Sequence, residues 1–253
     1  MPLVETESLI LKTYNLAEAD KIVLFLTEEH GVVRGVAKGV KRLNSRFGSG
    51  LEPFSVVRIT YFQKDVLELV SIQKVDLVTS YFSVAGNPDF LQKFSYLIEL
   101  LIESSPPHDP NETLYRMVRA CLESAGQDVT RLAAIGFYFE VWLLRLTGYL
   151  PQWKACAECG RELEAVESAN LVPGFNLVCD VCRPRSSTVR IEFVHRNIIG
   201  SALRLAPSEF ALFAADRHAQ LNEVSDVLKR VISQVLGRSV AEQRPLIASN
   251  NAK

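Results

Sequence analysis

Four of the five cysteines lie in two close pairs, Cys156 with Cys159 and Cys179 with Cys182. Two residues separate the members of each pair and nineteen separate the pairs, a spacing typical of a four-thiolate zinc site. Each pair can form a tight turn that directs both sulfurs at one ion. Because four protein sulfurs leave no open coordination position, we expect one structural Zn2+ ion rather than a catalytic one.

The spacing alone leaves other uses of these cysteines open: reduced free thiols, two redox-active pairs, or an iron centre in the same four-sulfur cage. The redox interpretation is weak, since neither pair lies between a strand and a helix of a thioredoxin-like unit. The fifth cysteine, Cys121, falls on the apolar side of a predicted helix, where we expect core packing. His195 and His218 are not needed as ligands once four thiolates are present.

A second candidate site is a run of cations with no acidic residue between Glu29 and Glu52. Its members are Arg34, Lys38, Lys41, Arg42 and Arg46. Glycines and Ser45 give the run the composition of a loop, so backbone amides and cationic side chains can both approach phosphates. The run predicts a local site for the nucleic-acid backbone, and a solvated charged loop is the alternative.

Aromatic residues flank this run, and single-strand binders combine such rings with cations because every base has a face that can stack. Phe47 lies within the loop and is the preferred stacking candidate. Phe54, Tyr61 and Phe62 follow a strand-like alternation and are expected in the core.

The overall charge and the motif content exclude several classes of protein. With 28 basic and 29 acidic residues the formal net charge is −1, which excludes a histone-like protein that holds nucleic acid by bulk charge. The sequence lacks a P-loop, a nucleophile elbow, a zincin helix and dinucleotide-binding glycines. We therefore expect no catalytic residues and no enzyme, with a nuclease or a thiol oxidoreductase at Cys156 and Cys159 as the weaker alternative.

Neither export nor membrane insertion is expected. The N-terminus has acidic residues where a signal peptide needs a positive start, so the protein is expected in the cytoplasm. The most apolar stretch, residues 132–150, is interrupted by Glu140 and Arg145 and falls short of the roughly 20 apolar residues of a spanning helix.

The elements that must position these residues change type along the chain. Alternating apolar residues predict five strands at 8–14, 21–27, 31–37, 55–62 and 66–78, which suit a closed or partly closed antiparallel barrel of the OB type. Three- and four-residue periods then predict helices at 90–104, 111–125, 130–150, 197–205, 208–219 and 223–236. Asn111 and Thr130 are expected to cap helices, Pro207 to start one and Gly237 to end one.

This pattern predicts an α+β multidomain protein in which a helical domain with an inserted zinc module follows an OB-fold barrel. The expected segments are 1–80 for the barrel, 81–151 and 191–240 for the helical domain, 152–190 for the zinc module and 241–253 for the tail. The zinc segment has little apolar periodicity, so we expect the ion to supply much of its folding free energy.

The stretch from Glu7 to Phe62 closely resembles the bacterial recombination mediator RecO family. The resemblance continues through FEVWLLRLTGYLPQW, the paired cysteines and LGRSV. It implies a non-catalytic protein that binds single- and double-stranded DNA and anneals complementary strands. The family's AKG-x-[RK]-[RK]-x-x-S-R-F motif matches residues 37–47, which assigns DNA contact to the cations there.

The resemblance also implies partners. Members of the family work with RecR to load RecA onto DNA coated by single-stranded DNA-binding protein (SSB), and they dock the acidic tail of SSB in the helical domain. Arg131 and Arg145 border an apolar helix and are candidates for that contact. A scaffold that binds RecR or SSB, with incidental DNA contacts, is the alternative function.

Overall fold

The computed structural model describes residues 2–42, 45–63, 69–184 and 189–237. These residues form two compact units that divide between Leu132 and Ala133. The predicted domain limits stay predictions, because a compact unit need not be a domain that folds alone. The start of the predicted fifth strand, the predicted tail and the end of the LGRSV motif lie outside the described residues.

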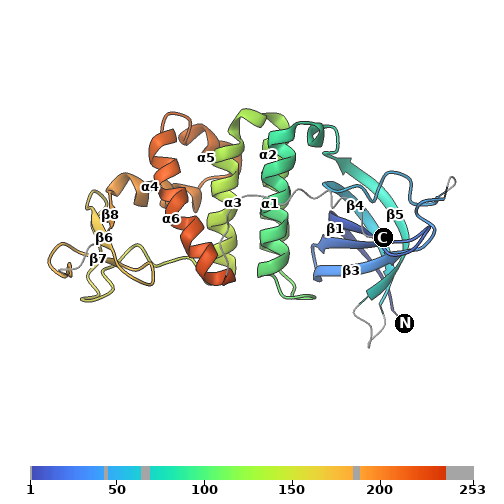
Figure 1. Cartoon of the computed structure of the whole chain (residues 1–253), viewed down its shortest axis with the longest axis horizontal. Helices are drawn as coiled ribbons and strands as arrows, with labels where there is room; N and C mark the ends of the chain where they lie inside the picture. Colours follow the sequence, from blue (N-terminus) through green and yellow to red (C-terminus); the bar gives the residue numbers. More distant parts are fainter. Residues whose placement is uncertain (1, 43–44, 64–68, 185–188, 238–253) are drawn as a thin grey trace, which may run out of the picture. The chain divides into compact units, whose positions relative to one another are not determined.

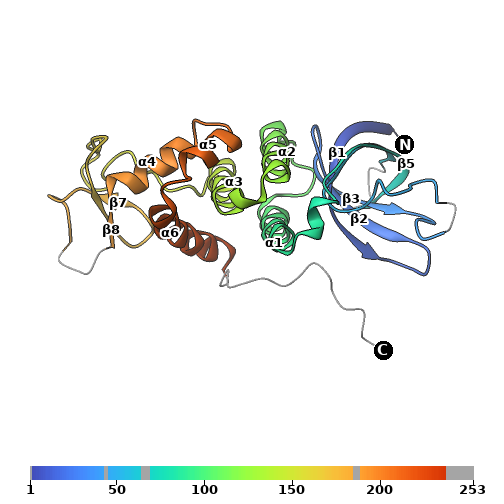
Figure 2. The same cartoon turned by 90° about the horizontal axis from the view of Figure 1, so that it is seen from above.

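The first unit is built on a closed barrel of five strands (Figure 2). The strands are β1 (Leu3–Asn15), β2 (Lys21–Thr27), β3 (Gly31–Ala37), β4 (Ser55–Phe62) and β5 (Leu69–Ser80). Around the ring they follow the order β1-β2-β3-β5-β4, and β4 pairs with β1 to close it. The fold class predicted from the sequence is confirmed, including the five strands and the OB-like N-terminal part.

One feature of the barrel differs from the sequence prediction. The predicted barrel is antiparallel, but β3 and β5 pair in parallel, with Arg34 opposite Leu69 and Val36 opposite Ser71. Along the chain, β3 and β5 are separated by the long β3–β4 connection and by β4, so the parallel pair needs no tight hairpin. Four of the five cations of the second candidate site lie in that connection, and Arg34 lies in β3.

Alternating side chains fill the barrel. Val23 and Phe25 in β2 and Val33 and Ala37 in β3 point inward, and all four are fully buried. Phe25 meets Tyr61 edge to face, with ring centroids 5.7 Å apart. The residues between them point outward, so the outer face of each strand is available to helices or to solvent.

Two helices, α1 (Pro88–Ser104) and α2 (Glu112–Gln127), complete the first unit; they overlap in Figure 1 and are seen separately, nearly end-on, in Figure 2. Phe54 connects the barrel to α1 through edge-to-face contacts with Phe90 and Phe94. Glu7 of β1 accepts a hydrogen bond of 2.8 Å from the Tyr115 hydroxyl of α2. Asn111 caps α2 as predicted, accepting from the Leu114 amide.

Short 3-10 turns occur at Val84–Gly86 and Val129–Arg131. The second of these corrects the predicted cap at Thr130. Asp128 is the residue that accepts the Thr130 amide, because its carboxylate reaches the free N–H two residues ahead. The helix proper then begins at Leu132.

Four helices form most of the second unit: α3 (Leu132–Leu146), α4 (Phe193–Ala202), α5 (Pro207–Phe213) and α6 (His218–Leu236). Phe137 of α3 stacks on Phe210 of α5 with a centroid distance of 5.9 Å. The Trp142 indole donates to the Ala202 carbonyl at 2.9 Å. Pro207 starts α5 and Gly237 ends α6 in the left-handed conformation, as predicted.

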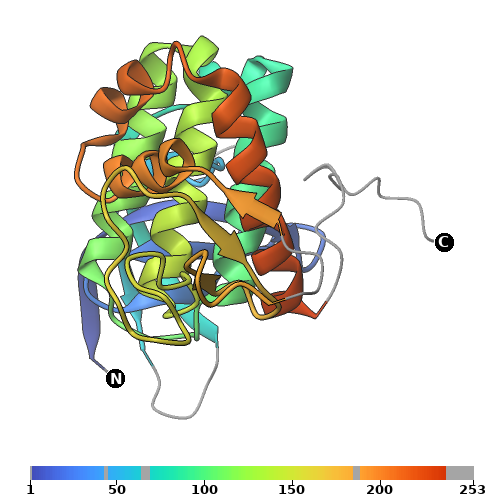
Figure 3. The same ribbon diagram turned by 90° about the vertical axis from the view of Figure 1, so that its left-hand side faces the viewer.

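A small three-stranded sheet in order β7-β6-β8 belongs to the same unit (Figure 3). Its strands are β6 (Ala169–Leu171), β7 (Leu177–Val178) and β8 (Val189–Ile191). Cys179 follows β7 directly, so the sheet positions one of the two cysteine pairs. In the described part of the chain, no helix is long and apolar enough to cross a membrane.

Candidate nucleic-acid interface and metal centre

The cation loop, defined as residues 38–51, leaves β3 and docks on the β1–β2 turn. The Gly39 amide donates to the Asp20 carboxylate at 2.8 Å, and the Lys41 amide donates to the Ala19 carbonyl at 3.1 Å. Gly39 has a φ of +72°, a conformation that glycine adopts at no steric cost. These contacts fix the backbone from which Lys38, Lys41 and Arg42 project.

The second half of the cation loop is anchored in the barrel. Phe47 and Leu51 are 3% and 2% exposed and pack with the barrel core. The close approach of Gly50 to Val75 leaves 2.8 Å to the place where a β-carbon would stand, so only glycine fits there. The loop is therefore held from inside by apolar side chains while its charges stay outside.

All five predicted cations are exposed: Arg34, Lys38, Lys41, Arg42 and Arg46. Among the ion pairs of the described residues, none involves these five. Arg46 lies over the Phe47 ring with its guanidinium carbon 5.0 Å from the centroid and donates weakly to the Ile72 carbonyl at 3.5 Å. Cations that lack acidic partners remain available to a polyanion.

The aromatic assignments need correction. Phe47 was predicted to stack on bases, but its ring is inside the barrel, because this apolar side chain is what anchors the loop. Phe54 and Tyr61 are in the core as predicted, whereas Phe62 is 37% exposed at the end of β4. Tyr14 is 43% exposed on β1 and is not among the aromatic residues that flank the cation run in the sequence.

The four predicted cysteines come together. The Sγ atoms of Cys156, Cys159, Cys179 and Cys182 all lie within 4.8 Å of one another. A tetrahedron with Zn–S bonds of about 2.3 Å places its sulfurs roughly 3.8 Å apart, so the cluster is close to the geometry that one ion requires. Four thiol ligands with no carboxylate suit a soft or borderline metal such as zinc.

Each cysteine pair sits in a turn that the sequence dictates. The Gly160 amide donates to the Cys156 carbonyl at 2.9 Å, and the positive φ of Gly160 lets the chain turn back to pair Ala155 with Glu162. In the second turn, the Cys182 amide donates to the Cys179 carbonyl at 3.1 Å. The Ala157 amide donates to the Leu177 carbonyl at 2.8 Å and joins the two turns.

The sulfurs differ in how readily they lose protons. Burial alone would raise the pKa of Cys156, but the backbone N–H groups of Cys159, Cys179 and Glu158 lower it to about 6. A hydrogen bond to Cys179 raises the pKa of Cys182 to about 12. These sulfurs compete for protons, and a divalent cation at the centre would remove the competition because it binds thiolates.

Two arginines support the cysteine module, residues 152–182. Arg161 donates to both carboxylate oxygens of Glu167 at 2.9 and 2.6 Å. Arg196, at the start of α4, donates to four backbone carbonyls at 2.7 to 3.1 Å: those of Trp153, Leu163, Glu164 and Glu167. One guanidinium thus satisfies four carbonyls that lie outside the small sheet of the module.

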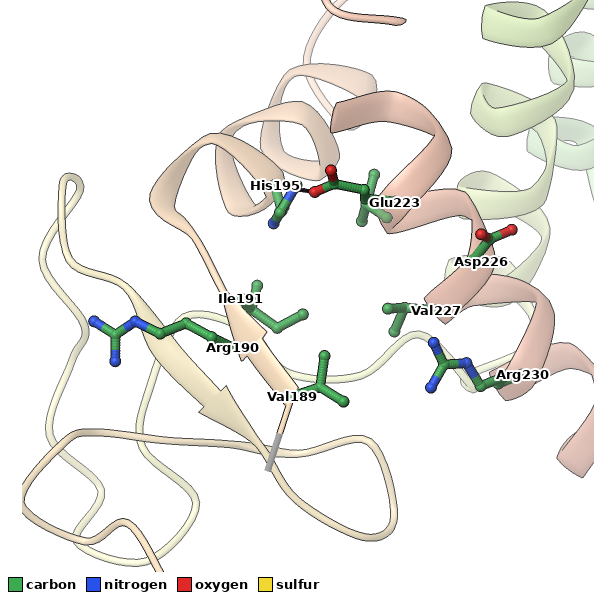
Figure 4. A pocket seen from close by; sticks show the side chains of 9 residues that line it. Val189, Arg190, Ile191, His195, Glu223, Asp226, Val227 and Arg230 are labelled. Carbon is green, nitrogen blue, oxygen red and sulfur yellow. Dashed lines mark hydrogen bonds and ion pairs between the residues drawn. The ribbon is translucent and has the colours of Figure 1, made fainter. Parts of the chain in front are cut away.

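A pocket of about 250 Å³ lies between β8 and α6 (Figure 4). Its lining includes Val189, Ile191 and Val227, and the His195 ring lies at its edge. Both ring nitrogens of His195 form hydrogen bonds. Nδ1 of His195 accepts from the Glu192 amide at 3.2 Å, so Nε2 carries the proton and donates to Glu223 at 2.8 Å. His195 therefore connects α4 to α6 and has no nitrogen left for a metal.

The candidates for a contact with an acidic peptide have partners of their own. Nε of Arg131 lies 2.8 Å from the Asp128 carboxylate, and the Arg145 guanidinium carbon lies 5.3 Å from the centroid of the Trp142 ring.

Cys121 is fully buried, and burial raises the pKa of its thiol. That burial agrees with the core role predicted for Cys121.

The fold and these sites together define a protein with an OB-like barrel, an exposed cluster of cations and a four-cysteine module. The family model described as recombination protein O N terminal matches residues 1–81, and that described as recombination protein O C terminal matches residues 94–243. The chain belongs to the RecO family. This confirms the family predicted from the sequence, which is one of recombination mediators rather than enzymes.

Curated relatives agree with this family assignment. The DNA repair protein RecO of Geobacter metallireducens is 32% identical over 70% of this chain and 71% of its own length. That of Koribacter versatilis is 32% identical over 63% of this chain and 65% of its own. The RecO protein of an Anaeromyxobacter species is 27% identical over 96% of both chains, so the similarity extends beyond the barrel into the helices and the cysteine module.

Proposed function

We propose that this chain is a DNA-binding recombination mediator that contacts the sugar-phosphate backbone through Arg34, Lys38, Lys41, Arg42 and Arg46. The observation that carries the proposal is the exposure of all five cations without acidic partners, next to a barrel of a type that binds oligonucleotides. Phe47 is left out of the interface because its ring is buried.

In this role the chain binds single- and double-stranded DNA and anneals complementary strands. Neutralised phosphates lower the repulsion between two strands, which is the physical basis of annealing by a charged surface. With RecR, it helps to load RecA onto DNA coated by SSB, whose tail binds the helical part. One Zn2+ ion at the four cysteines has a structural role, and the protein works in the cytoplasm at the nucleoid.

A salt titration tests the DNA interface. If four or five phosphates are neutralised, the logarithm of the affinity for a single strand falls with the logarithm of the salt concentration at a slope of about −3 to −3.5. The triple variant Lys41→Glu/Arg42→Glu/Arg46→Glu should lose most of this slope and most of its affinity. Its circular dichroism spectrum should match that of the wild type, since exposed charges contribute little to stability.

The control is a triple reversal of exposed cations in the second unit, Lys154→Glu/Arg204→Glu/Lys229→Glu. It makes the same change in net charge away from the cation loop. Equal losses in both variants, or no loss in the loop variant, would show that the interface is misplaced. An absence of DNA affinity near physiological salt would favour a scaffold for partner proteins.

A further inference from the structure

Tyr14 stands at the end of an apolar strip on the outside of the barrel. It pairs with Ile22 in β2, which in turn pairs with Val36 in β3. Their neighbours Val23 and Ala37 are buried in the barrel core, so the alternation of the strands places Tyr14, Ile22 and Val36 on the outer face. Ile22 and Val36 are half-buried and Tyr14 is 43% exposed, so the strip is open to solvent.

The strip adjoins the proposed DNA-binding cations. Arg34 and Lys38 stand two residues before and after Val36, so they flank it along the chain. On the other side of the strip, the β1–β2 turn follows Tyr14. In this turn the Ala19 carbonyl accepts a hydrogen bond from the Lys41 backbone amide, and the Ala17 carbonyl accepts one from the Lys41 Nζ. Adjacent strands are about 4.8 Å apart, so roughly 10 Å separates the backbones at Tyr14 and Val36. A short piece of one nucleic-acid strand can reach both.

The Tyr14 ring is held in position by a neighbour. Nζ of Lys12 lies 5.1 Å from the ring centroid, and the same ammonium forms an ion pair with Glu99 of α1. Lys12 and Tyr14 both point outward from β1, since they are two positions apart in the strand. A ring that is already held loses less conformational entropy when a ligand stacks on it.

We propose that Tyr14 is a stacking platform for an unpaired base of a single strand whose phosphates bind the cation loop. This inference rests on the proposed function and deepens it. The faces of the bases are hidden inside a duplex, so Tyr14 contributes to single-strand binding only. The five cations act on the phosphates of single strands and duplexes alike. On this proposal, Tyr14 gives the surface a preference for single strands over duplexes.

The test compares Tyr14→Ala with Tyr14→Phe in the full chain. A stacked base contributes enough that Tyr14→Ala should weaken binding of a single-stranded oligonucleotide roughly 5- to 150-fold. Tyr14→Phe keeps the ring and should stay within about twofold of the wild type, as should duplex binding by both variants. Tyr149→Ala is the control, because Tyr149 is a 54% exposed tyrosine in the second unit.

A second measurement does not depend on Tyr14→Ala folding well. In Tyr14→Trp, a stacked base quenches the new indole, so adding the oligonucleotide should lower its emission beyond the change seen in the wild type. No additional quenching would overturn the proposal. So would a Tyr14→Ala variant that binds single strands as the wild type does, or that weakens duplex binding equally.

The failures of the two proposals can be told apart. If the cation-loop triple variant loses affinity but Tyr14→Ala does not, Tyr14 is no platform and the proposed function stands. If the triple variant keeps its affinity, the proposed interface is wrong whatever Tyr14 does.

Discussion

The cation loop and the cysteine module are both short, rich in turns and poor in regular structure, but they are held in opposite ways. The loop inserts Phe47 and Leu51 into the core of the barrel and keeps its charges on the outside. The module places its chemically active side chains at its centre, where four sulfurs lie within 4.8 Å. Apolar side chains hold the first, and an ion at the sulfurs would hold the second.

This difference decides whether binding and folding can be separated by mutation. In the cation loop, the side chains offered to a ligand are not those that hold the loop, so its charges can change while the fold persists. In the cysteine module, the same four residues bind the ion and hold the chain, so no ligand can change without loss of structure.

The largest effect should follow removal of the metal. Structural zinc contributes about 10 to 16 kcal/mol to the folding of isolated zinc-finger peptides. We expect about one zinc per chain in the purified protein, and a strong chelator should abolish hydrogen-exchange protection in residues 152–182. Cys156→Ser and Cys179→Ser should do the same without chelator, while protection in the barrel persists.

Cys121→Ala is the matched control, because it removes a buried cysteine outside the module and should keep the full zinc content. DNA affinity of the chelated protein should stay within about twofold of the untreated protein, since phosphate contacts come from the barrel. Unchanged protection of residues 152–182 in metal-free protein would show that the module is held by its own packing.

The next effect concerns two neighbours in the cation loop. Phe47→Ala removes a buried ring and should lower the free energy of unfolding by about 3 to 5 kcal/mol, measured by denaturant titration. Arg46→Ala removes an exposed cation and should change the free energy of unfolding by less than about 0.5 kcal/mol. For DNA binding the order should be the opposite. Only Arg46→Ala should reduce the slope of DNA affinity against salt concentration, by about 0.7. If a Phe47→Leu variant kept full stability but bound single strands more weakly, the Phe47 ring would belong to the DNA interface after all.

The same contrast explains what the sequence could predict. Cysteine spacing correctly predicted that the four sulfurs come together, because two short turns suffice to do so. The five strands followed from alternation, since Val23 and Phe25 must face one way and Leu24 the other. The exposure of the cations followed from the cost of burying an unpaired charge.

The errors arise where the position of a residue depends on distant parts of the chain. Phe47 stands in a loop by sequence, and only the barrel that closes beneath it makes it a core residue. Tyr14 stands in a strand and lies beside the cation loop only because β1 pairs with β2 and β2 with β3. Arg196 is fourteen positions beyond the last cysteine, and no local pattern indicates that it binds four carbonyls of the module.

Arg196→Ala should have a smaller effect on stability than Phe47→Ala, and it is the sharpest test of how the cysteine module is held. Arg196→Ala leaves four carbonyls without their donor. We expect it to lower the free energy of unfolding of the cysteine module by about 2 kcal/mol, since hydrogen bonds from a charged group contribute more than neutral ones. Arg196→Lys should recover only part of this loss, because a single ammonium cannot reproduce the forked donors of a guanidinium.

The measurement is the rate at which a chelator removes zinc, together with hydrogen exchange over residues 152–182. Both should rise in Arg196→Ala and stay near the wild-type values in Arg204→Ala, which removes an exposed arginine of the same unit. If Arg196→Ala releases zinc no faster than the wild type, the ion alone holds the module. Faster release would show that the guanidinium shares that role, as Phe47 and Leu51 share the anchoring of the cation loop.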